Sequence, residues 1–139
     1  MPLEENKAIA VPETDQAQDV PLIKSKERVQ KHGEVFTPDW MVKKMLSYPE
    51  IQEKLQDMHS TFLEPSAGEG AFLTEILRQK LAYVNRNPAS RGGHWQYNTL
   101  WALMSIYGIE FLEDNLTIAR ANMLQVFGEN YREKTGREL

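Results

Sequence analysis

The stretch TFLEPSAGEGAFL, residues 61–73, limits the possible folds more than any other part of the chain. Its apolar start predicts a brief buried strand, which Pro65 ends. Gly68 and Gly70 allow the backbone to approach a ligand, and Gly68 can take a positive φ at little cost. Apolar residues at helical spacing follow and predict a helix that begins near Gly70 and continues to Val84. The stretch therefore predicts a strand, a tight loop and a helix.

A loop of this kind, at the carboxyl end of a parallel strand, is where open α/β sheets bind nucleotides. A dinucleotide fingerprint would need a third glycine where this chain has Leu73, so that pattern fails. Glu64 precedes the loop and would repel a pyrophosphate, whereas a cation such as the amino group of a methionine moiety suits a carboxylate. The alternative is a glycine turn between strand and helix that binds no ligand.

Residues 106–111 predict a second strand that ends in a carboxylate. Two carboxylate oxygens match two vicinal hydroxyl donors, so Glu110 is the candidate for binding a ribose, and Phe111 could lie against an adenine ring. The distance from Glu64 to Glu110 is 110 − 64 = 46 positions, longer than the roughly 20 of a bare βαβ unit. Residues 85–105 are therefore expected to be an insertion, whose aromatic residues favour core packing over base stacking.

Two motifs carry a family resemblance. Residues 64–72, EPSAGEGAF, resemble the S-adenosylmethionine loop of DNA methyltransferases that modify exocyclic amino groups, chiefly of adenine. Residues 33–38, GEVFTP, resemble the segment that precedes this loop in the same class and holds the methionine end of the cofactor. Capping of a helix, with Thr37 as N-cap and Pro38 at the first helical position, is the alternative for the second motif. The candidate cofactor-binding residues are Phe36, Thr37, Pro38, Glu64, Pro65, Ser66, Ala67, Gly68, Gly70, Phe72, Glu110 and Phe111.

The resemblance implies an α/β fold, a truncated Rossmann-like methyltransferase sheet with flanking helices. Residues 1–24 are expected to form a flexible tail and residues 25–139 a partial S-adenosylmethionine-binding domain. The implied function is the cofactor-binding part of a DNA (adenine) amino-methyltransferase from a restriction-modification or phage system. We expect it to be inactive alone, because the Asn/Asp-Pro-Pro-aromatic catalytic loop is absent: the one Asn-Pro, at Asn87, is followed by Ala-Ser and comes before Glu110. The alternatives are an interaction fragment that completes its sheet with a partner chain, and part of an RNA or protein amine methyltransferase.

The charge and composition narrow the partners. A formal net charge of −4 is the wrong sign for a broad grip on nucleic acid, so any DNA contact is expected through a missing or separate part. Residues 24–32 are basic and read as a solvated linker or as a few phosphate contacts. The chain has no cysteine and no histidine pair at metal-ligand spacing, so we expect no metal site. Without a signal peptide or an apolar run of about 20 residues, we expect a cytoplasmic protein with no membrane contact.

Overall fold

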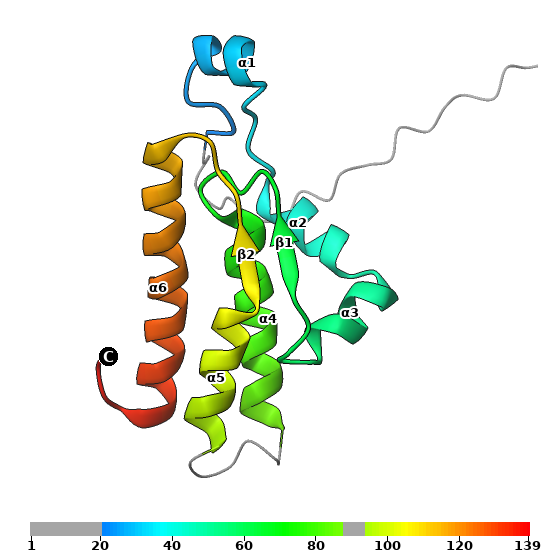
Figure 1. Cartoon of the computed structure of the whole chain (residues 1–139), viewed down its shortest axis with the longest axis vertical. Helices are drawn as coiled ribbons and strands as arrows, with labels where there is room; N and C mark the ends of the chain where they lie inside the picture. Colours follow the sequence, from blue (N-terminus) through cyan, green and yellow to red (C-terminus); the bar gives the residue numbers. More distant parts are fainter. Residues whose placement is uncertain (1–20, 88–93) are drawn as a thin grey trace, which may run out of the picture.

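The structure, a computed structural model, describes residues 21–87 and 94–139 (Figure 1). Residues 1–20 of the predicted tail and residues 88–93 of the predicted insertion lie outside this part. The elements in chain order are α1 (Lys26–His32), α2 (Asp39–Leu46), α3 (Pro49–Leu55), β1 (Phe62–Glu64), α4 (Ala71–Arg86), α5 (His94–Met104), β2 (Ile106–Gly108) and α6 (Glu113–Thr135).

The predicted strand, loop and helix are confirmed as β1, residues 65–70 and α4. The second strand is also confirmed, although it ends at Gly108, and it pairs with β1 in parallel with Leu63 opposite Tyr107. A Cβ atom on Gly108 would lie 2.7 Å from Leu73 Cδ1. Strand β2 therefore lies directly on α4 at this point, closer than a side chain would permit.

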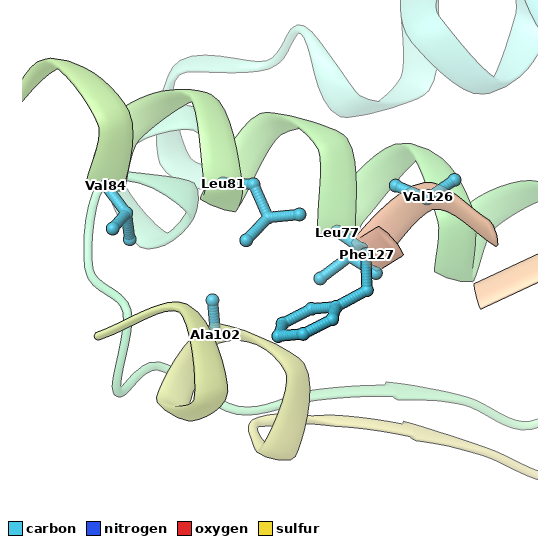
Figure 2. Close-up of a cluster of buried hydrophobic side chains, with 6 residues drawn as sticks. All are labelled: Leu77, Leu81, Val84, Ala102, Val126 and Phe127. Carbon is cyan, nitrogen blue, oxygen red and sulfur yellow. The ribbon is translucent and has the colours of Figure 1, made fainter. Parts of the chain in front are cut away.

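Helix α4 is the centre of the molecule. Three of its residues, Leu77, Leu81 and Val84, point toward Ala102 of α5 and toward the two α6 residues Val126 and Phe127 (Figure 2). Leu77 and Val84 have no exposed surface, because apolar positions at helical spacing face one side of α4. This cluster holds α5 and α6 against α4.

A second cluster lies between α4 and the two short helices α2 and α3. It consists of the buried residues Val42, Leu46, Leu55 and Ile76. Phe62 of β1 and Ile106 of β2 pack against it, so one face of the strand pair is covered by helices. The opposite face carries Leu63 and Tyr107, which are 64% and 56% exposed, and is left open.

Lys80 of α4 connects the two residues that precede the strands. The residue is completely buried, and its ammonium donates to the Ser60 carbonyl oxygen and, at 2.5 Å, to Ser105 Oγ. Ser60 lies shortly before β1, and Ser105 immediately precedes β2. Burial lowers the pKa of Lys80 to about 8, because taking the ammonium out of water disfavours its charged form.

The expected truncated Rossmann-like sheet is wrong. The described residues form six helices and one sheet of two parallel strands, each only three residues long. Two such strands cannot form the layer on which doubly wound folds are built, and here α4 takes that place as the element against which the others pack. No helix in the described residues is long and apolar enough to cross a membrane.

The capping alternative for Thr37 is wrong, and neither α2 nor α6 starts with a side-chain cap. Helix α2 begins at Asp39 with Pro38 in the N-cap position, so Thr37 does not cap it. Helix α6 begins at Glu113 after Leu112, again with no side-chain cap. The polar residues at its start, Asp114 and Asn115, bond to other segments of the chain instead.

Candidate functional site

The glycine loop is shaped by backbone conformation and by one carboxylate. Gly68 and Gly70 have φ values of 57° and 93°, in the left-handed region that favours glycine. Ser66 N–H donates to Glu64 Oε1 at 2.9 Å, so the carboxylate predicted to face a cation also closes the first turn of the loop. Ala67 N–H donates to the carbonyl oxygen of Ile109 at 2.9 Å and fixes the loop to the end of β2.

Glu110 is the residue that links the loop to the second strand. Its Oε2 accepts from Gly68 N–H at 2.5 Å, and its Oε1 accepts from Leu112 N–H at 3.0 Å. Gly68, where the backbone is predicted to approach the ligand, and Glu110, predicted to bind its ribose, are therefore in direct contact. Each carboxylate oxygen can accept further hydrogen bonds, because it offers two lone pairs.

Phe36 brings the second motif to the same place. A Cβ atom on Gly68 would lie 3.2 Å from Cδ1 and Cε1 of the Phe36 ring. The GEVFTP segment and the glycine loop are some thirty residues apart in the sequence. They are in contact here, because the Phe36 ring lies against the backbone of Gly68. Glycine at position 68 is required twice, by its positive φ and by the ring beside it.

The remaining predicted residues divide between the loop and the core. Phe111 is 86% exposed at the end of β2, and its ring lies 5.7 Å from that of His32. Phe72 is half-buried and packs against the cluster between α2, α3 and α4, so packing accounts for this side chain. Pro65 is exposed in the loop, whereas Thr37 and Pro38 lead directly from Phe36 into α2.

Charged side chains from the first described segment surround this region. Lys24 Nζ lies 2.9 Å from Glu69 Oε1 in the loop and 3.2 Å from Asp114 Oδ2 at the start of α6. Arg28 donates to both Asp114 oxygens, at 2.6 and 3.1 Å, and to Glu34 Oε2 at 2.9 Å. The guanidinium of Arg28, joined by Lys24, holds the pKa of Asp114 well below its usual range.

Sequence reasoning missed these charged residues as part of the site. The sequence predicts a flexible tail that ends at Lys24 and a solvated linker or phosphate contacts for the segment with Arg28, and it gives no reason to bring Asp114 to either. The spacing of Lys24 and Arg28, four residues apart, was the available signal, since it suits two cations on one side of a helical turn. It gives no indication of their partners at the start of α6, which lie 86 to 91 positions away.

The arrangement offers acceptors for hydroxyl donors and negative charge for a cationic group. Three carboxylates, from Glu64, Glu69 and Glu110, lie in or beside the glycine loop, and the N-terminus of α4 points its first N–H groups toward it. In the described ranges, no three His, Cys, Asp or Glu side chains converge as a metal site would need.

Comparison of the chain with family models, with curated proteins and with solved structures gives no match. Functional inference therefore depends on the chemistry of these residues.

Proposed function

We propose that this chain binds S-adenosylmethionine through the glycine loop and Glu110, as the cofactor-binding part of a DNA (adenine) amino-methyltransferase of a restriction-modification or phage system. The observation that carries the proposal is the hydrogen bond from Gly68 N–H to Glu110, with the Phe36 ring beside the same glycine. Three separate segments that are predicted to form one cofactor site are in contact. The proposal depends on this local arrangement and not on the sheet, because function resides in sites and not in folds.

Each end of the cofactor has a partner of suitable chemistry. The carboxylate of Glu110 can accept from the two ribose hydroxyls while retaining its backbone donors. Phe111, exposed beside it, offers a ring face to the adenine. Glu64 and Glu69 supply negative charge near the sulfonium and the amino group of the methionine moiety.

Methyl transfer to DNA would need a further part. The sequence holds no Asn/Asp-Pro-Pro-aromatic loop with which to grip an extruded base. Together with the net charge of −4, this supports a division of labour in which DNA binding and the base pocket come from a separate part or chain. An RNA or protein amine methyltransferase would use the same cofactor residues and differ in that separate part.

Isothermal titration with S-adenosylhomocysteine tests the proposal. We expect binding to the wild-type chain and its loss in Gly68→Val, because valine can neither take a φ of 57° without strain nor fit beside Phe36. Gly136→Ala is the matched control. Gly136 has a φ of 69°, and a Cβ atom added there would meet no other atom within 4 Å, so this variant imposes backbone strain far from the site.

A second variant guards against misfolding of the first. Glu110→Gln keeps the size of the side chain and one acceptor oxygen, and we expect it to weaken binding at least tenfold, about 1.4 kcal/mol, with an unchanged circular dichroism spectrum. Absence of any heat from the wild-type chain at millimolar ligand would refute the proposal.

The open face of the strand pair favours one alternative, an interaction fragment completed by a partner chain. Leu63, Tyr107 and Ile109 are 64%, 56% and 57% exposed there, whereas parallel sheets are normally covered on both faces. Light scattering after size exclusion, with and without the product of the neighbouring gene, tests whether the chain associates with a partner. Leu63→Lys should abolish an association that Leu139→Lys, which changes an exposed terminal leucine, leaves intact; a monomer under both conditions would exclude this alternative.

A further inference from the structure

Residues 21–36, here called the strap, lie across the carboxyl ends of both strands. Phe36 N–H donates to the Leu22 carbonyl oxygen at 2.7 Å, so the two ends of the strap are joined and α1 lies between them. Figure 1 shows α1 beyond the tips of β1 and β2, on the side where the glycine loop lies. The strap contacts Gly68 through Phe36, and Phe111 through His32. It therefore reaches both sides of the proposed cofactor site.

The strap is attached by charge and not by burial. None of its residues is buried, and α1 in particular contributes nothing to either hydrophobic cluster. Its attachment to the rest of the molecule includes the two bonds from Arg28 to Asp114 and the contacts of Lys24 with Glu69 and Asp114. Asp114 thus receives two cations of the strap, Lys24 and Arg28.

Asn115 bonds to both ends of the strap and fixes its position. The residue is completely buried, its Oδ1 accepts from Lys24 at 2.5 Å, and its Nδ2 donates to Glu34 Oε2 at 2.6 Å. One amide at the start of α6 therefore positions a cation near the beginning of the strap and an anion near its end. A buried amide that is bonded through both its oxygen and its nitrogen has a defined orientation, so the strap has one closed position.

Attachment of this kind is released more easily than the core. Partly exposed ion pairs contribute little each and are screened by salt, whereas the α4 clusters depend on buried apolar surface. A seven-residue helix with no buried side chain is also marginal by itself, so α1 is expected to unwind when the strap detaches. Opening of the strap can thus occur without unfolding the rest of the chain.

We infer that the strap is a salt-sensitive cover of the site, latched by Asp114, which opens to let the cofactor in and out. The ligand part of this inference rests on the proposed function, whereas the opening of the strap does not. Cofactor exchange is then controlled by the ion pairs of Lys24 and Arg28 with α6.

Hydrogen exchange followed by mass spectrometry measures the opening without any ligand. In Asp114→Asn, which loses the pairs with Lys24 and Arg28, we expect amides of residues 29–33 to exchange about fivefold faster, the upper end of what one exposed ion pair contributes. Raising NaCl from about 0.1 M to about 1 M, where the Debye length falls from about 10 Å to about 3 Å, should accelerate the same amides in the wild type and far less in the variant. Amides of α4 should stay far more protected than those of α1 in both cases, because they exchange only by global unfolding.

Glu27→Gln is the matched control. Glu27 pairs with Lys31 at 2.7 Å inside α1, so this variant removes one carboxylate and one ion pair from the strap but no contact with α6. We expect its amides to exchange less than about twofold faster. Acceleration equal to that of Asp114→Asn, or protection of α1 amides as high as that of α4 amides, would overturn the inference.

Stopped-flow binding of S-adenosylhomocysteine then connects the cover to the ligand. This ligand has no net charge at neutral pH, so salt acts on it little through long-range steering. We expect both its association and its dissociation to be about fivefold faster in Asp114→Asn, and wild-type rates to approach those of the variant at high salt. Binding with rates that neither change affects would refute the cover and leave the proposed function intact. Faster exchange of α1 amides with no binding of ligand would refute the proposed function and leave the cover intact.

Discussion

Replacing Lys80 by methionine should change how the stability of this protein depends on pH. The ammonium of Lys80 is buried beneath the starts of β1 and β2 and is bonded to the Ser60 carbonyl oxygen and to Ser105 Oγ. Its pKa is lowered by burial from 10.5 to about 8 in the folded chain. Methionine has a similar length and no charge, so the variant removes the titration while filling most of the same space.

The sign follows from which state binds the proton. Below pH 8 Lys80 is protonated in both the folded and the unfolded chain, and above pH 10.5 it is protonated in neither. Between these values only the unfolded chain holds the proton, so the free energy of unfolding rises with pH. Each pKa unit corresponds to about 1.36 kcal/mol, so the wild type should gain on the order of 3 kcal/mol relative to Lys80→Met across this window.

Urea denaturation followed by tryptophan fluorescence at a series of pH values measures this gain. Asp57, whose pKa Lys80 helps to lower, is ionised at every pH used, so the difference between the free energies of unfolding of the two proteins isolates Lys80. Lys54→Met removes an exposed lysine of α3 and serves as the control for the loss of one positive charge. A difference between wild type and Lys80→Met that stays constant from pH 7 to pH 11 would refute the reasoning.

The remaining predictions concern packing. Gly108→Ala should lower the free energy of unfolding by about 1–3 kcal/mol in urea denaturation, because the new Cβ would lie 2.7 Å from Leu73 Cδ1 in a packed site. Gly128→Ala, in the middle of α6 with its nearest atom at 3.4 Å, should instead raise stability by about 0.5–1 kcal/mol; equal effects of the two changes would contradict the close approach of β2 to α4. Leu77→Ala, at a position with no exposed surface, should cost about 2–5 kcal/mol, and a cost below 1 kcal/mol would contradict the central place of α4.

The local structure of the chain could be predicted from its sequence. The strand, the glycine loop and the start of α4 follow from a short apolar run, a proline and two glycines, and the helical spacing of the apolar residues defines the face of α4 that is buried. The second strand follows from its apolar residues in the same way. These features depend on residues close together in the sequence, where conformational preference and periodicity are informative.

The fold class could not be predicted in this way. One apolar strand gives no information on how many strands pair beside it, and the family resemblance supplied an extended sheet that the described residues do not contain. In the structure, helices pack around α4 instead. How many strands a sheet has is decided by pairing between distant segments, which no local pattern records.

The candidate site, too, could be predicted from the sequence only in part. Its glycines and carboxylates were recognised from residue type and spacing, and their role in binding a cofactor remains a prediction. Only the tertiary structure joined Glu110 to Gly68 across 42 positions and Arg28 to Asp114 across 86. A charge in a sequence identifies no partner, because every opposite charge is equally eligible until the packing of α4, β2 and α6 decides which ones meet.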